Sequence, residues 1–403
     1  MTPWPRIRSA GARRATVAAV LLGLAGCEFG TAPPFEQAAS NATDELLEQT
    51  RQLPALLVKI EKSLGAAPGG PKSLVVIDPM LDTATGQQTV TTTLLEKRVV
   101  DRTQAKFEQF EFLPFQAATL TRAQYLLTGT MTRVPGQPVK KVLRINLALT
   151  DLRSGEVVAQ ASALARDEHL DATPLRYYND SPVLLKDKVI EGYVRTTASP
   201  AGVKADTHYM ARIAASAMIK EATSLYNAER YQEALGQYRN ALATPEGEQL
   251  RTLSGIYLSS VKLGKLADAE KAFAQVVALG FAYNELGVKF LFNPGSTEFW
   301  SDGRMSSAYG MWLRQIARES VAANACLNIV GHTSHSGPAP ANDALSLKRA
   351  VYVRQRLTSE AASLGPKIQA TGMGYHQNIV GSGTDNATDV LDRRVEFKIV
   401  PCK

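Results

Sequence analysis

The stretch that decides the fold of the C-terminal part opens with Leu327-Asn-Ile-Val-Gly-His-Thr333 and closes with Asp392-Arg-Arg-Val-Glu396. Between these motifs the residues from Leu345 to Leu357 follow a helical repeat, in which Leu347 and Val351 lie one turn apart. We therefore predict a helix over 345–357. The chain has 403 residues, enough for about two to three domains, so this stretch accounts for only the last of them.

Residues 286–403 resemble the OmpA-like peptidoglycan-binding domain over nearly their whole length. The 327–333 motif is similar to the strand that enters the family's binding loop, and the 392–396 motif matches the family's terminal [N/D]-R-R-V-E. The other matching positions follow in family order and are Val288-Lys-Phe-Leu-Phe292, Gly337, Asn342, Leu345-Ser346, Arg349-Ala350 and Gly372-Met-Gly374. The resemblance implies a βαβαββ fold that binds peptidoglycan and carries out no reaction.

The resemblance also implies a site for diaminopimelate, which presents an ammonium and a carboxylate side by side. The carboxylate-binding arginine of the family falls on Arg349, whose planar guanidinium can donate two parallel hydrogen bonds. The ammonium-binding aspartate falls on Ser334, which brings no charge, so we expect affinity to fall by about an order of magnitude or more. Asp392 is a candidate for the missing charge. The predicted ligand-binding residues are Thr333, Ser334, Asn342, Arg349, Asp392 and Arg393.

Residues 1–26 have the features of a secretory signal peptide. They hold four arginines, no acidic residue, and an apolar run from Ala15 to Gly26 that is too short to span a bilayer. The last residues, Leu24-Ala-Gly-Cys27, resemble the lipobox of bacterial lipoproteins, which implies cleavage before Cys27 and its acylation with chains such as palmitate. Glu28 then implies sorting to the outer membrane. The alternative is an ordinary signal peptide with an incidental cysteine.

Three cysteines are too few for a disulfide scaffold, and an odd number leaves one unpaired. With Cys27 assigned to the lipid, Cys326 and Cys402 remain as a pair in an oxidising periplasm. We favour a disulfide between them, which would tie down the last strand. The alternative is two separately buried thiols.

Along the remainder of the chain, the residue pattern that predicts helices, strands or linkers changes several times. The predicted borders are 1–26 signal peptide, 27–71 lipid-anchored tether, 72–168 α/β domain, 169–205 irregular linker, 206–285 TPR-like helical repeats and 286–403 OmpA-like domain. The tether is expected to hold a helix around 44–64, broken at Pro54, and a linker at 66–71.

The 72–168 segment predicts a compact α/β unit. A helix is predicted over 90–106, and the predicted strands are 73–78, 107–115, 125–133, 142–149 and 156–160. The phrases YLLTGT at 125–130 and ALTDLRSGEVV at 148–158 are similar to the periplasmic domain of curli-secretion and flagellar outer-membrane lipoproteins and of penicillin-binding-protein activators. Asp78, before Pro79, is interpreted as a turn cap.

An internal repeat lies in the 206–285 segment. Tyr231-Gln-Glu-Ala234 lines up with Leu266-Ala-Asp-Ala269 at an offset of 35 residues, close to the period of tetratricopeptide (TPR) repeats. Two repeats are too few to stand alone, so we expect them to pack against a neighbouring domain. Such helices serve either as a peptide-binding face or as a rigid spacer, and the sequence leaves both open.

No sequence motif points to an enzyme, a metal or a cofactor. GxxxxGK[ST], HExxH and GxSxG are all missing from the sequence. His332, His335 and His376 are not interpreted as a metal site, because the histidine before the threonine, His332 here, is common in the OmpA-like family without metal. Residues 385–389 are interpreted as a turn, because they lack the central Gly and terminal Glu of a calcium loop.

The net charge of +7 loses four arginines with the leader and becomes +3. Residues 288–403 hold 13 basic against 9 acidic side chains, so the excess falls on the domain expected to meet the carboxylate-rich cell wall. Nucleic acid is therefore not a predicted partner.

We predict an α+β multidomain lipoprotein of the outer membrane that faces the periplasm and anchors the membrane to peptidoglycan. The alternative is an adaptor or assembly factor whose TPR-like and α/β domains bind a protein partner, with weak or no binding of peptidoglycan.

Overall fold

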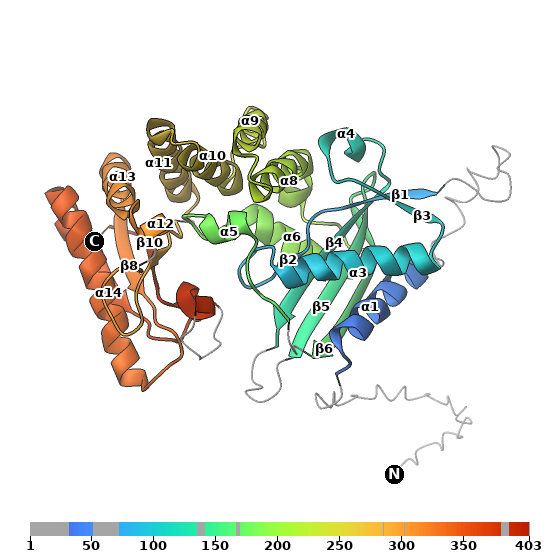
Figure 1. Cartoon of the computed structure of the whole chain (residues 1–403), viewed down its shortest axis with the longest axis horizontal. Helices are drawn as coiled ribbons and strands as arrows, with labels where there is room; N and C mark the ends of the chain where they lie inside the picture. The colour runs from blue at the N-terminus through green and yellow to red at the C-terminus, as the bar shows by residue number, and fades with distance from the viewer. Residues whose placement is uncertain are drawn as a thin grey trace, which may run out of the picture. The chain divides into compact units, whose positions relative to one another are not determined.

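The computed structural model describes residues 32–50, 72–134, 142–166, 170–284, 286–301, 303–379 and 387–402 (Figure 1). The predicted leader at 1–26, the lipidation site Cys27 and the predicted linker at 66–71 lie outside these ranges. Among the described residues, no helix combines the length and the apolar character that crossing a bilayer requires.

A mixed sheet forms the first half of the described chain. Its strands follow the order β3-β1-β4-β5-β6, with β2 paired to β4. Strands β3, β1 and β4 are parallel, whereas β4, β5 and β6 form an antiparallel meander. The bounds are β1 (Ser73–Ile77), β2 (Leu81–Asp82), β3 (Phe110–Leu113), β4 (Tyr125–Arg133), β5 (Val142–Asp151) and β6 (Glu156–Arg166). The predicted strands agree with β1, β4 and β5 to within two residues, whereas β3 is shorter and β6 is longer than predicted and β2 is not among the predicted strands.

Helix α3 (Val90–Lys106) has the predicted bounds because Thr89 caps it. The Thr89 hydroxyl accepts a hydrogen bond from the Thr92 amide, and the Thr92 hydroxyl accepts one from the Thr89 amide. This reciprocal pair satisfies two amides that the first turn of a helix would otherwise leave without partners. The short helix α4 (Ala117–Leu120) then leads into β4.

Helix α1 (Phe35–Thr50) is an integral part of the first core. It lies beside α3 across one face of the sheet (Figure 1), with Ala38, Ala42 and Leu46 fully buried. Asp44 of α1 accepts a hydrogen bond of 2.7 Å from Arg102 Nε of α3. The prediction of a tether over 27–71 is therefore wrong for residues 35–50.

The opposite face of the sheet is covered by α6 (Lys188–Ala198), a helix that the predicted irregular linker at 169–205 did not contain. Asp187 caps it by accepting hydrogen bonds from the amides of Val189 and Ile190. Tyr193 of α6 donates to the Gly129 carbonyl of β4 at 2.9 Å, which fixes the helix on the sheet. The linker prediction is wrong for this segment, because α6 completes the α/β core.

Helical pairs follow the sheet. The helices are α5 (Arg176–Asp180), α7 (Thr207–Met210), α8 (Ile213–Asn227), α9 (Tyr231–Leu242), α10 (Leu250–Lys262) and α11 (Leu266–Tyr283). The two copies of the repeated motif begin α9 and α11, and both repeat alanines, Ala234 and Ala269, are buried. Gly255 of α10 lies against the Tyr238 ring, where an added Cβ would be 2.3 Å from the ring, so the small residue permits this close approach.

The C-terminal part follows the β-α-β-α-β-β order that the resemblance implies. Its main elements are β7 (Phe290–Leu291), α12 (Gly303–Ser306), α13 (Tyr309–Ala322), β8 (Cys326–Gly331), α14 (Ala339–Glu360), β9 (Ile368–Gly372) and β10 (Arg394–Val400). The sheet order is β7-β10-β8-β9, with β10 antiparallel to β7 and β8 and with β9 parallel to β8. The predicted 345–357 helix lies within α14.

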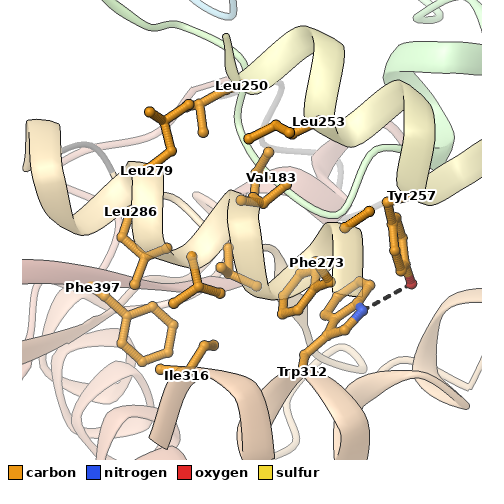
Figure 2. Packing of buried hydrophobic residues seen from close by; sticks show 14 of the residues in the cluster. Val183, Leu250, Leu253, Tyr257, Phe273, Leu279, Leu286, Trp312, Ile316 and Phe397 are labelled. Carbon is orange, nitrogen blue, oxygen red and sulfur yellow. Dashed lines mark hydrogen bonds between the residues drawn. The ribbon is translucent and has the colours of Figure 1, made fainter. Parts of the chain in front are cut away.

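One hydrophobic cluster extends from the helical pairs into the C-terminal part (Figure 2). Trp312 of α13 stacks on Phe273 of α11 at 5.3 Å, and its indole N–H donates to the Tyr257 hydroxyl at 2.9 Å. A backbone hydrogen bond also joins the segment before α6 to the start of the C-terminal part, since the Leu184 amide donates to the Gly287 carbonyl at 2.7 Å. The helices therefore pack against a neighbouring domain, as two repeats require.

A disulfide joins Cys326, the first residue of β8, to Cys402, which follows β10. The two cysteines are 76 residues apart in sequence. Their bridge fastens the end of β10 to the start of β8, where Val400 pairs with Cys326.

Candidate ligand site of the C-terminal domain

Two glycines bring α14 close to the sheet. A Cβ on Gly331, at the end of β8, would lie 1.9 Å from the Ser346 carbonyl oxygen, and one on Gly372 would lie 2.6 Å from the Leu347 amide nitrogen. Only glycine allows backbone to approach backbone so closely. The packing places the loop that follows β8, residues 332–338, beside the first turns of α14.

The 332–338 loop is held by Asn342. Its side-chain amide donates to the carbonyls of Ser336 at 2.7 Å and Pro338 at 3.2 Å, and the residue is 6% exposed. Gly337 has φ +81°, a conformation that favours glycine. The structure therefore assigns Asn342 to holding the loop in shape, whereas the resemblance placed it among the ligand-binding residues.

Arg349 lies at the centre of the site and is only 1% exposed. Each of its three guanidinium nitrogens donates to a backbone carbonyl: Nη1 to His332 at 3.0 Å, Nε to Ser296 at 2.9 Å and Nη2 to Asn293 at 3.0 Å. The Phe292 ring lies 5.1 Å from the guanidinium carbon. Arg349 therefore joins the 332–338 loop to the loop that follows β7.

Arg393 reaches the same loop from the other side. Its Nε donates to the Phe292 carbonyl at 3.2 Å, and the Trp300 ring lies 5.4 Å from its guanidinium carbon. The neighbouring Asp392 is fully buried and accepts a hydrogen bond of 2.6 Å from the Ile379 amide. The carboxylate of Asp392 thus holds the segment that leads to Ile379.

Thr333 and Ser334 lie directly after the carbonyl that Arg349 contacts. Thr333 is 1% exposed, and its hydroxyl has no hydrogen-bond partner in the described ranges. Ser334 is also buried, with its hydroxyl 3.5 Å from that of Ser336. Both hydroxyls are neutral, whereas the OmpA-like domains that the sequence resembles have a threonine followed by an aspartate carboxylate at these two positions.

The three histidines of the C-terminal domain have different surroundings. His332 is fully buried 3.7 Å from the Glu396 carboxylate, and burial, with Arg394 second, lowers its pKa to about 3. The His335 ring contacts the Tyr375 ring at 4.2 Å, and His376 lies 3.6 Å from Asp343. Across the described residues, no three or more His, Cys, Asp or Glu side chains are grouped to hold a metal ion. Residues 385 and 386 of the suspected calcium turn lie outside those residues.

Sequence reasoning missed the loop after β7 altogether. Asn293, Ser296 and Trp300 contact the two buried arginines, yet no family motif or spacing includes them. Asn293-Pro-Gly295 is a turn signal, and it could have predicted a loop here. Nothing in the pattern relates that loop to an arginine more than fifty residues away in sequence.

A second buried polar cluster lies where β1 ends. Asp78 is 5% exposed and accepts a hydrogen bond of 2.6 Å from the Tyr209 hydroxyl, so its interpretation as a turn cap is wrong. Asp78, Tyr209 and Arg251 line a cavity of about 20 Å³, which has room for a group the size of a water molecule. Burial raises the pKa of Asp78 to about 6, against smaller opposite effects of the Tyr209 hydrogen bond and of Arg251 and Lys220.

This pKa predicts a pH-dependent stability. The folded chain holds the Asp78 proton more tightly than the unfolded chain does. The stabilisation that protonated Asp78 contributes to the unfolding free energy is therefore full below pH 3.8 and is lost as the pH rises through about 6. We expect the unfolding free energy of the wild type, relative to Asp78→Asn, to fall by about 2 kcal/mol between pH 4 and pH 7 in urea titrations. Tyr209→Phe removes a hydrogen bond that lowers the pKa of Asp78. In this variant the fall in unfolding free energy should therefore extend to higher pH. Parallel curves for wild type and Asp78→Asn would contradict the assignment.

Comparison with known proteins identifies the C-terminal domain. The model of the OmpA family matches residues 291–390, so this quarter of the chain is an OmpA-family domain. Among solved structures, the chain is similar to the peptidoglycan-associated lipoprotein from Burkholderia pseudomallei, with 24% identity over 28% of this chain and 89% of that one and a TM-score of 0.24. A search of curated proteins finds no match.

Proposed function

We propose that this chain is an outer-membrane lipoprotein that binds peptidoglycan non-covalently through its OmpA-family domain. The observation that carries the proposal is the hydrogen bond from Arg349 to the His332 carbonyl, which places the arginine beside Thr333 and Ser334. The family match over 291–390 supports the same ligand class. No catalysis is proposed, because the role of the site is recognition.

The proposed ligand is the diaminopimelate of the stem peptide. Its carboxylate would be held by the guanidinium of Arg349, which offers a planar set of donors. Its ammonium would donate to the hydroxyls of Thr333 and Ser334, without a charge partner at either position. Arg393 would add a second positive charge near the carboxylate. The resulting complex is weaker than one with an aspartate at position 334, since charge-assisted hydrogen bonds are about twice as strong as neutral ones.

Restoring that aspartate tests the site. Ser334→Asp is expected to raise the affinity for purified sacculi about tenfold, measured by sedimentation of the full chain at low salt. Ser359→Asp is the matched control, since it adds the same charge at an exposed position in the last turn of α14, away from the loop, and should leave the affinity unchanged. Equal gains for both variants would mean that charge alone, and not the site, determines binding.

We also propose that Cys27 carries the lipid anchor. Cys27→Ser is expected to release the chain into the soluble periplasmic fraction, because about 0.8 kcal/mol of membrane affinity is lost for each buried CH₂ of the acyl chains. The measurement is fractionation of cells that express either form. A serine variant that stays with the membrane fraction would rule out the anchor.

A second candidate function is that of an adaptor for another envelope protein. We propose that α8–α11 are TPR-like and that the N-terminal part is of the curli and flagellar lipoprotein type. In favour of an adaptor, Leu266 and Val261 are 70% and 37% exposed beside the turn between α10 and α11. The sacculus experiment bears on both candidates, because wild type that sediments at low salt supports peptidoglycan binding, whereas wild type that stays in the supernatant favours the adaptor.

A further inference from the structure

The loop after β7, residues 293–300, is folded on itself. The Asn293 amide donates to the Glu298 carbonyl at 3.1 Å, and the Trp300 amide donates to the Leu291 carbonyl at 2.8 Å. The Asn293 side chain also accepts a hydrogen bond of 3.1 Å from the Ser301 amide. Gly295, at the tip, has φ +61°. The first of these hydrogen bonds lies within the loop, and the other two tie it to β7 and to Ser301, so the closed position of the loop depends on its folded shape.

The loop is fastened to the site by the two buried arginines, and to the core by Phe299, whose ring lies 5.2 Å from Phe292 and 4.8 Å from Tyr309. Arg349 donates to the carbonyls of Asn293 and Ser296, and Trp300 covers the guanidinium of Arg393. Both arginines are 1% exposed. Two of the three nitrogens with which Arg349 could hold a carboxylate therefore donate to the loop.

We propose that residues 293–298 of this loop are a lid, closed in the free protein, that must release Arg349 before the stem peptide can bind, while Phe299 stays in the core. The inference rests on the proposed function, since it takes diaminopimelate as the ligand. The carboxylate of the ligand replaces the Asn293 and Ser296 carbonyls as the acceptor of the Arg349 hydrogen bonds. The apparent affinity is then the affinity of the open form multiplied by the fraction of molecules in which the lid is open.

Gly295 offers a way to open the lid without touching the arginines. It is exposed, and a Cβ added there would meet no atom within 4 Å, so Gly295→Ala affects only the backbone conformation. A positive φ is unfavourable for alanine and tolerated by asparagine, which makes Gly295→Asn the matched control. Gly264→Ala is the second control, since Gly264 has φ +70° and equally empty surroundings in the helical part.

The experiment measures the dissociation constant of the full chain for a diaminopimelate-containing disaccharide tetrapeptide by calorimetry. We expect Gly295→Ala to bind about threefold to tenfold more tightly than wild type, because it raises the open fraction. Gly295→Asn and Gly264→Ala should bind like wild type. Asn293→Ala, which removes the tie to Ser301 but keeps the carbonyl, is a second opening variant, and near-ultraviolet circular dichroism reports whether each variant is folded.

Each outcome decides a separate claim. Wild type that binds while both folded opening variants bind no more tightly overturns the lid and leaves the proposed function in place. Binding by the opening variants alone supports the lid and means that wild type is held closed. If neither wild type nor the opening variants bind, the proposed function is wrong and the lid is rejected with it.

Discussion

Arg349→Ala is expected to abolish sedimentation with sacculi and to lower the unfolding free energy of the chain by about 3–5 kcal/mol. The alanine removes the donor to three backbone carbonyls, those of Asn293, Ser296 and His332. Each buried acceptor left without a partner costs about 1–3 kcal/mol, and the three carbonyls lie on two loops that the arginine joins. Urea unfolding measures the stability, and sedimentation measures the binding.

Arg349→Lys separates the structural role from the binding role. Lysine keeps the charge but replaces the planar fork with a single ammonium, so it can reach only part of the carbonyl set. We expect it to recover part of the stability and little of the binding. An alanine variant that unfolds at the wild-type urea concentration, and still sediments with sacculi, would disprove both roles.

Removing the disulfide should have an effect of similar size. The double variant Cys326→Ser/Cys402→Ser is expected to lose about 4 kcal/mol of unfolding free energy, because the bridge closes a loop with a sequence separation of 76 residues. The loss comes mainly from the greater freedom of the unfolded chain. It should appear in urea titrations as a lower midpoint.

A reducing agent provides the control for this variant. Wild type treated with a reductant should lose as much stability as the double variant, whereas the double variant should not respond to the reductant. Full wild-type stability of the double variant would show that the pairing of β10 with β7 and β8 holds the strand without the disulfide.

Regular elements with a local signal were predictable. The 90–106 helix has its own cap at Thr89. The apolar run at 73–77 is a strand between β3 and β4 that buries both faces, with Val75 toward α1 and Val76 toward α6. Helix α1 could not be found in full, because its buried stripe consists largely of alanines such as Ala38 and Ala42, which carry little hydrophobic signal. Its place in the core depends on the sheet that it covers.

The candidate site was predictable as a set of positions and not as a geometry. Motif order identified Arg349 and the 333–334 pair, and the structure places them beside one another through the His332 carbonyl. The burial of Arg349 under the 293–300 loop was not predictable, because its partners there are backbone carbonyls, which every residue type carries. Because the acceptors are backbone atoms, the identities of Asn293 and Ser296 carry no sign of this contact.

The aromatic junction of Tyr257, Phe273 and Trp312 has a mechanical consequence. A domain on a slack linker can rotate while the rest of its chain stays still, but rotation here would pull stacked rings apart and expose them to water. The OmpA-family domain and the α10–α11 pair therefore form one stiff element. Under the proposed binding to peptidoglycan, tension on that domain would pass to the helices through these rings.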